Sequence, residues 1–422
     1  MSSGSESANA IAARSTAVTA RGSLVGWLAP LWGFCGFLPV GVMYLNLVLM
    51  ATALLLAPDW RVRWQRVRRS ALVNPVLLMV LWTLVVVAVG SWYPDTESRL
   101  FHTFRVALLI FLGLALSQTE SRLALTGFII GGLVAALVVA VHHVWPLPPW
   151  ALWRSLLQSR NNFSSGNMIS MAIVGGLLLL LGIRSQIGWT ERVGLLAASG
   201  ALASTVVLHA ASRNSQLLLV VLVITAVVYR FRSLRAAVAG VLAALVLVGA
   251  AWQFSSTTQT RFTEIADSLR SATAQENYGS SVGVRWRMYQ EALSAMRDEP
   301  VFGNGLGSWQ PHWQTVWMGL DQKMSPEQQL QFADINNPHN DFLLAGMEMG
   351  IPGMLILFWL LWRFVHPGWR QSNLAGGITV LLGMAMFTTT LLNAPFRDAA
   401  LGMTLLWLLA ASVAGHGADG DA

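Results

Sequence analysis

The chain contains almost no cysteine and little charge. Its 422 residues include a single cysteine, Cys35, and only 11% of them are aspartate, glutamate, lysine or arginine. One thiol excludes an internal disulfide framework and a thiolate metal site. What the chain has in quantity is apolar sequence, since 55% of its residues are hydrophobic and its mean hydropathy is +0.55. This composition is typical of a polytopic membrane protein.

Apolar runs long enough to cross the hydrocarbon of a bilayer predict an all-α polytopic fold with about twelve transmembrane helices. The runs lie near residues 24–40, 42–58, 71–91, 103–118, 123–142, 164–183, 193–209, 214–229, 236–253, 339–365, 374–391 and 398–415. Only a turn around Pro39 separates the first two runs. The chain therefore divides into a tail, nine helices, a large and partly helical loop, three helices and a second tail. These parts cover residues 1–23, 24–253, 254–338, 339–415 and 416–422.

Arginines between the runs predict which side of the membrane each loop faces. With a cytoplasmic N-terminus, thirteen arginines fall in inside loops: Arg61, Arg63, Arg66, Arg68, Arg69, Arg122, Arg184, Arg192, Arg230, Arg232, Arg235, Arg363 and Arg370. Five fall in short outside loops: Arg99, Arg154, Arg160, Arg213 and Arg397. This positive-inside bias places both termini in the cytoplasm and the large loop on the outer face. The net charge of +7 is thus a topology signal and gives no reason to expect nucleic-acid binding.

The loop at 254–338 is long enough to be functional or separately folded. Within it, residues 281–298 are predicted to form an amphipathic helix, because apolar side chains follow one stripe. The stripe consists of Val284, Met288, Ala292 and Ala295. Arg285 lies one turn before Tyr289, so these two side chains share a face. The glycine-rich run at 303–307 ends this helix. We interpret it as a turn, because no strand–turn–helix unit surrounds it as a dinucleotide site requires.

A polar segment at 336–341 joins this loop to the next apolar run. Asn337 is predicted to be the N-cap and Pro338 the first helical residue. His339 would then lie in the first turn, where free backbone N–H groups and the positive end of the helix dipole collect. An imidazole at such an anion-attracting position suits chemistry on a phosphorylated substrate. The alternative is a histidine that only caps the helix.

Arginines are expected to gather at the same outer face. Arg213 lies in a tight turn before the eighth run, Arg160 precedes the sixth run, and Arg285 lies in the large loop. Because a guanidinium presents a planar fork of donors that matches phosphate oxygens, several of them would hold a pyrophosphate without a metal. No Asp, His or Cys cluster with metal-ligand spacing occurs in the loop sequence. For Arg213 alone, contact with lipid headgroups is an alternative explanation.

Two further features are interpreted as structural. Glu348 lies nine residues into the tenth run, where an acidic side chain requires a partner. We expect it to satisfy backbone groups freed by a kink at Pro352. Trp317, like other tryptophans near the ends of the runs, is interpreted as an interfacial anchor.

Together, these motifs resemble the O-antigen ligase/polymerase superfamily. One block is Pro338-His339-Asn340, followed by Phe342-Leu343, Glu348, Gly350 and Gly353. Another is Ser212-Arg213-Asn214 at the head of an apolar run, and a third contains Arg285, Tyr289, Ala292-Leu293, Pro300 and the glycine turn. The blocks extend over about residues 210–355. Two positions depart from the family pattern, since Tyr289 replaces a common tryptophan and Asn214 a more usual glycine. Neither change removes a charge.

The resemblance implies a fold similar to that of the GT-C glycosyltransferases. It also implies activity on O-antigen carried by undecaprenyl pyrophosphate at the periplasmic face of the inner membrane. In this family His339 would be the general base or would position the acceptor hydroxyl. Arg213 and Arg285 would bind the pyrophosphate and stabilise it as it leaves. Arg160, Asn340 and Arg287 are the implied substrate-binding residues. No cofactor, metal or ATP is expected, because undecaprenyl pyrophosphate is already a good leaving group.

Three functions stay open at this point. A ligase that transfers O-antigen onto lipid A–core is favoured, because protein-glycosylating relatives usually carry a longer C-terminal extension. A polymerase would use the same donor with another lipid-linked glycan as acceptor. A twelve-helix transporter is the alternative from another class, and it would require broken helices or paired charges near the bilayer midplane. Apart from Glu348 and Arg105, the apolar runs contain few ionisable groups.

Overall fold

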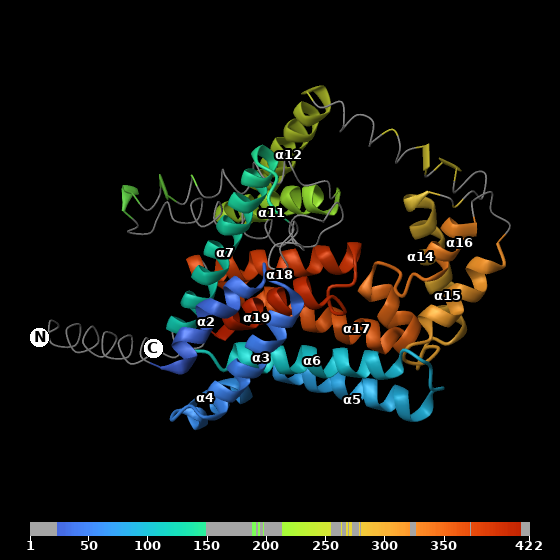
Figure 1. Cartoon of the computed structure of the whole chain (residues 1–422), viewed down its shortest axis with the longest axis horizontal. Coiled ribbons are helices and arrows are strands. Elements are labelled where there is room, and N and C mark those ends of the chain that lie inside the picture. Colours follow the sequence, from blue (N-terminus) through green and yellow to red (C-terminus); the bar gives the residue numbers. More distant parts are fainter. Residues whose placement is uncertain are drawn as a thin grey trace, which may run out of the picture.

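The computed structural model of the chain describes residues 23–148, 213–254, 280–320, 326–371 and 373–414, with scattered single residues between 188 and 278. Every secondary-structure element in these ranges is a helix, and they contain no strand (Figure 1). The predicted all-α class is confirmed for this part of the chain. The expected span at 164–183, nearly all of the span at 193–209, and Arg160 lie outside the described residues.

Fourteen helices make up the described part. The first six are α2 (Leu24–Cys35), α3 (Val40–Leu55), α4 (Trp60–Arg69), α5 (Val73–Val89), α6 (Thr96–Leu114) and α7 (Gln118–Val144). They are followed by α11 (Arg213–Phe231) and α12 (Leu234–Phe254). The large loop contains α14 (Ser281–Asp298), α15 (Trp309–Met318) and α16 (Pro326–Ala333). The last three are α17 (Asp341–Arg370), α18 (Leu374–Leu392) and α19 (Ala399–Ala414).

Three of these helices are long and apolar enough to cross a membrane, at 118–142, 341–370 and 375–392. A fourth span results if α3 and α4, which meet at an angle of 108°, are counted as one broken span. Shorter apolar helices lie at 24–35, 73–89, 217–231 and 401–414. Twelve spans are therefore not confirmed. One reason is that apolar runs continue into turns: α2 ends at Cys35, because the chain must leave the helical conformation before Pro39.

Helix α17 is central to the packing, with α5, α14 and α18 against it (Figure 1). Helix α19 packs against α6 and α18, and α2 packs against α7 and α3. Large side chains fill the space between these helices and are fully buried, among them Phe364, Met386 and Trp407. Trp32 of α2 stacks on Trp407 of α19 with ring centroids 4.7 Å apart. Within a membrane, close packing of such side chains stabilises the bundle through van der Waals contacts.

Hydrogen bonds between helix ends define two ends of the bundle. The Tyr229 hydroxyl, near the end of α11, donates to the carbonyl oxygen of Asn373 just before α18, at 3.0 Å. Since α11 packs along α18, the two helices are antiparallel, and Arg213 at the start of α11 lies toward the end of α18. The Asn340 side chain donates to the carbonyl oxygen of Leu391 at 3.2 Å, which brings the start of α17 to the same place. We call this the His339 end and the opposite one the basic end.

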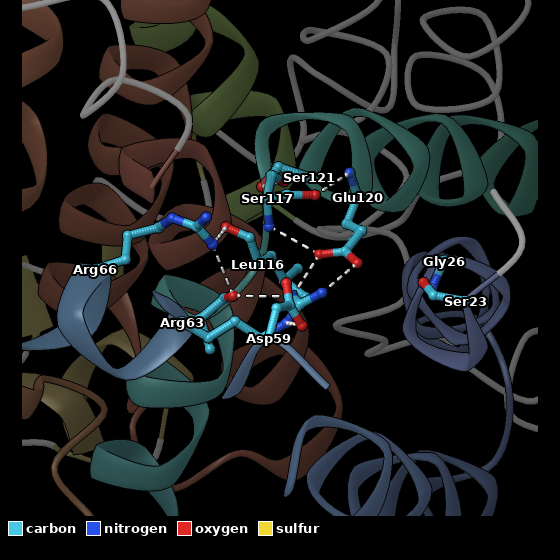
Figure 2. Close-up of polar contacts among 10 residues, drawn as sticks. Ser23, Gly26, Asp59, Arg63, Arg66, Leu116, Ser117, Glu120 and Ser121 are labelled. Carbon is cyan, nitrogen blue, oxygen red and sulfur yellow. Dashed lines mark hydrogen bonds and ion pairs between the residues drawn. The ribbon is translucent and has the colours of Figure 1, made fainter. Parts of the chain in front are cut away.

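The basic end contains arginines that the sequence assigns to the cytoplasmic side. Arg63 donates from both terminal nitrogens to Glu120, at 2.7 and 2.8 Å, and from Nε to Asp59 at 2.8 Å (Figure 2). Arg66 donates to two backbone carbonyls at the end of α6, which have no partner within that helix. These contacts join α4 to α6 and α7. The sequence pattern treats this stretch as a loop, whereas the structure forms a helix there.

Residues of the large loop form a second hydrophobic core against α17. The predicted apolar stripe of α14 is confirmed, because all four of its side chains are buried. They are Val284, Met288, Ala292 and Ala295. It packs with three tryptophans of α15 whose rings follow one another at centroid distances of 5.7 and 5.2 Å, namely Trp309, Trp313 and Trp317. Trp317 is thus fully buried, and its interpretation as an interfacial anchor was wrong. The spacing of four residues places all three rings on one face of α15.

Candidate active site

His339 lies just before α17, in a turn. Asn340 is the N-cap of α17, and its Oδ1 accepts hydrogen bonds from the N–H groups of Phe342 and Leu343 at 3.0 and 3.1 Å. The prediction that Asn337 caps this helix and that His339 lies in its first turn was therefore wrong. Asn337 Oδ1 instead accepts from the His339 N–H at 2.9 Å. This local turn accommodates the left-handed φ of +52° at His339.

Burial favours the neutral form of the His339 imidazole. Its Nδ1 lies 3.0 Å from Oδ1 of Asn393, which follows α18. Burial lowers the pKa of His339, and the positive charge of Arg285 lowers this pKa further, while the hydrogen bond with Asn393 opposes both. The main cause of the lower pKa is loss of solvent.

Helix α14 brings Arg285 within electrostatic reach of His339, and Tyr289 into contact with Asn340. Ser280 caps this helix by accepting from the Gly283 N–H at 3.0 Å, and the buried stripe of α14 fixes its rotation. Burial raises the pKa of Tyr289, whereas the charge of Arg285 and a hydrogen bond with the Asn340 side chain lower it. Arg285 therefore acts electrostatically on both His339 and Tyr289. The third motif block and the histidine motif, about fifty residues apart in sequence, converge on one place.

The glycine turn docks α14 onto a break in α17. Gly350 has φ of +71° and interrupts the helix, so nearby backbone groups need other partners. The Ile351 N–H donates to the carbonyl oxygen of Pro300 at 2.8 Å, and the Asn304 N–H donates to that of Met347 at 2.8 Å. A Cβ at Gly350 would lie 2.1 Å from the carbonyl oxygen of Val301. Close approach of two backbones is thus the reason for glycine here.

A buried ion network lies beside the histidine. Arg99 of α6 contacts Glu348 at 2.8 Å and Asp95 at 3.2 Å, and Arg397 contacts Asp95 at 2.9 Å. Both arginines donate to the carbonyl oxygen of Asn336. The expectation that Glu348 satisfies the backbone at the kink is corrected, because its carboxylate pairs with Arg99. Burial lowers the pKa of Arg397 to about 10 despite its acidic neighbours.

For the other predicted site residues, the structure gives contacts away from His339 or does not describe the side chain. Arg287 pairs with Glu291 one turn along α14, at 2.6 Å, and its guanidinium lies over the Tyr278 ring, 5.7 Å from the centroid. Arg213 is the first residue of α11, at the His339 end, and its side chain lies outside the described part. Arg160 lies outside it altogether. The binding roles of these three residues stay predictions.

Sequence reasoning missed Asn393 and the partners of the ion network. From the sequence, Arg99 and Arg397 were assigned only to short outside loops. The need of Glu348 for a partner was a usable signal, but several arginines satisfy it equally well until the helices are packed. Within the ranges that the structure describes, no group of three or more His, Cys, Asp or Glu side chains is placed to hold a metal ion.

Comparison with known proteins gives one family match. Residues 198–358 match the family model described as O-antigen ligase. The matched region contains Arg213, Arg285 and His339, and it ends before Asn393 and Arg397. No curated protein matches the chain.

Proposed function

From the O-antigen ligase/polymerase superfamily domain that this chain carries, we propose that the enzyme is an O-antigen ligase. It would transfer O-antigen from undecaprenyl pyrophosphate to lipid A–core at the periplasmic face of the inner membrane. The observation that supports this best is the convergence of a histidine, whose neutral form burial favours, and an arginine on a separate element, beside the start of α17 and the end of α18. A base beside a positive charge suits glycosyl transfer from a pyrophosphate donor, because one accepts the proton of the acceptor hydroxyl and the other stabilises the leaving pyrophosphate.

In the proposed reaction, an acceptor hydroxyl of lipid A–core attacks the anomeric carbon of the lipid-linked sugar. His339 accepts the hydroxyl proton as the new C–O bond forms. The bond between the anomeric carbon and the pyrophosphate oxygen breaks, and undecaprenyl pyrophosphate leaves with the electron pair. Arg285, with Arg213, binds the pyrophosphate and stabilises its negative charge. The proton passes from His339 to solvent or to the departing phosphate, which restores the neutral imidazole.

Arg160, Asn340 and Arg287 are assigned to substrate binding in this proposal. The Asn340 side chain caps α17 and contacts Tyr289 and the end of α18, so its part in substrate binding rests on the resemblance alone. No divalent metal is expected, because the arginines neutralise the charge that Mg²⁺ neutralises in many transferases.

An in vitro transfer assay tests the proposal. Purified protein is mixed with lipid-linked O-antigen and rough lipopolysaccharide, with EDTA and without ATP. The expected product is lipopolysaccharide that carries O-antigen. Extension of the lipid-linked glycan instead would identify a polymerase. Loss of all transfer in EDTA, restored by one metal ion, would overturn the metal-free mechanism.

A deletion strain separates ligase from polymerase in cells. Loss of a ligase leaves long glycan on the lipid carrier, whereas loss of a polymerase leaves core capped with single units. If both assays are negative and the protein in liposomes moves a solute, the chain is a transporter.

A further inference from the structure

Asn393 lies where it can set the chemical state of His339. It follows the last residue of α18, is almost fully buried, and its N–H donates to the carbonyl oxygen of Thr389 at 2.8 Å. Its Oδ1 lies 3.0 Å from Nδ1 of His339. An amide oxygen has lone pairs and no proton. A hydrogen bond at this distance therefore requires the proton on Nδ1 of the ring.

We propose that Asn393 is a positioning residue that fixes the tautomer of His339 and so leaves Nε2 free to accept the substrate proton. This inference rests on the proposed role of His339 as the base. In neutral imidazole one ring nitrogen donates and the other accepts. Without a partner at Nδ1, the ring would distribute between two tautomers and could rotate, and in one of them Nε2 would be unable to act as a base.

Both partners of this hydrogen bond are held by their backbones. The His339 N–H is bound by Asn337 Oδ1, and the next residue, Asn340, reaches back to the carbonyl oxygen of Leu391 at 3.2 Å. On the other side, Asp341 accepts from the Phe396 N–H at 3.0 Å. The 391–397 segment is thus fixed against the start of α17 at two further points. The geometry of the histidine–asparagine pair follows from the fold and does not depend on bound substrate.

The charged and titratable groups around the ring come from each neighbouring element. Arg285 acts on it electrostatically from α14, where Tyr289 contacts the Asn340 side chain. Asp341 begins α17, and Arg397, which pairs with Asp95, follows α18. Among the described residues, the hydrogen-bond partner of Nδ1 is Asn393. A change at Asn393 should therefore alter the pH dependence of transfer through His339.

Two substitutions at Asn393 test the proposal, because one should keep transfer and the other should reduce it. Asn393→Asp keeps an acceptor and adds negative charge, so transfer should persist, with the acid limb of the kcat/KM profile moved to higher pH. Asn393→Leu has similar size and no acceptor, so kcat should fall about 10- to 100-fold, the size of effect seen when the hydrogen-bond partner that orients a metal-ligating histidine is removed. Donor KM should change little. Asn373→Leu, at the other end of α18, is the control for helix stability and should leave the pH profile unchanged.

The outcomes separate this proposal from the proposed function. If His339→Ala retains transfer, the base assignment fails and the positioning role fails with it. If His339→Ala is inactive but Asn393→Asp and Asn393→Leu both keep the wild-type pH profile and kcat, only the positioning role is overturned. Inactive Asn393→Asp beside active Asn393→Leu would mean that transfer needs no hydrogen-bond acceptor at Nδ1, which also overturns the positioning role. Thermal unfolding of each variant identifies a loss caused by misfolding.

Discussion

At the residue scale, His339 and Arg285 are expected to divide the work of the site. His339→Ala should reduce transfer by about 10²–10⁴-fold, the usual contribution of a general base, while donor affinity stays near wild type. Arg285→Ala should weaken donor binding roughly tenfold or more as well, because a hydrogen bond to a charged group contributes about 1.5–3 kcal/mol. Isothermal titration with undecaprenyl pyrophosphate and single-turnover assays measure the two effects.

Arg297→Ala is the matched control for this pair, because it removes an exposed arginine from the same helix. It should change neither quantity. Arg285→Lys should recover little, since an ammonium is a point charge without the two-pronged geometry of a guanidinium. Equal loss of donor affinity in His339→Ala and Arg285→Ala would make the histidine a phosphate ligand, and the base would then lie elsewhere.

The pKa of His339 predicts how activity depends on pH. A base must be neutral, and the pKa of His339 is lowered by burial and by Arg285. The neutral ring therefore persists below about pH 6.5, the ordinary pKa of histidine. The kcat/KM profile of the free enzyme should stay flat on lowering the pH through that value and fall only at lower pH. An acid limb above pH 6.5 would contradict the assignment of that limb to His339.

At the scale of elements, the glycine turn after α14 docks at the break in α17 at Gly350, and this contact holds α14 in place. Gly350→Ala would introduce a left-handed non-glycine residue, with a strain of about 1–3 kcal/mol, and its Cβ would clash with Val301. We expect a lower Tm and reduced transfer, because the shift moves Arg285 away from His339. Gly41→Ala is the control, since a Cβ at that position in α3 meets no atom within 4 Å. Equal effects of the two substitutions on Tm and transfer would contradict the role of Gly350 in holding α14.

The ion pair of Arg99 and Glu348 links α6 to α17 just before the break at Gly350. Both side chains are almost fully buried, and removing one partner of a buried pair costs about 3–5 kcal/mol. Glu348→Ala should therefore lower the free energy of unfolding strongly, as measured by thermal or denaturant unfolding in detergent. Glu97→Ala removes an exposed acidic residue from the first turn of α6 and should have little effect. A stable Glu348→Ala variant would show that Asp95 alone satisfies Arg99.

At the scale of the whole molecule, charge distinguishes the two ends of the bundle. Arg63 and Arg66 are at the basic end, and at that end Arg363 donates to the carbonyl oxygen of Ala71 at 3.3 Å. His339 is at the other end. The thirteen-to-five arginine distribution predicts that the basic end is cytoplasmic and the His339 end periplasmic.

Cysteine labelling tests this orientation, and the single native cysteine, Cys35, is buried. Glu327→Cys in α16 and Gln65→Cys in α4 place exposed thiols on opposite sides. A membrane-impermeant maleimide should label Glu327→Cys in cells whose outer membrane alone is permeabilised. Gln65→Cys should react only after lysis of the inner membrane. The reverse pattern would place the site in the cytoplasm and overturn the proposed function.

The sequence by itself determined the features that depend on local periodicity. The length and hydropathy of the runs predicted helices, and the stripe from Val284 to Ala295 predicted both the bounds and the buried face of α14. The resemblance carried by the motifs predicted that His339 and Arg285 act together, and this stays a prediction. The helices and the buried face of α14 follow from the sequence because the side chains that face a common environment recur with the helical repeat.

Tertiary structure decided what depends on contacts between distant segments. Asn337 and Asn340 are both good N-caps, and the choice of Asn340 follows from its bonds to Leu391 and Tyr289. Glu348 required a partner, but only helix packing selects Arg99. Asn393 carries no motif and lies 54 residues from the histidine that it contacts. A sequence states which groups need partners, whereas the choice among equivalent partners depends on which of them the packed helices bring within hydrogen-bond distance.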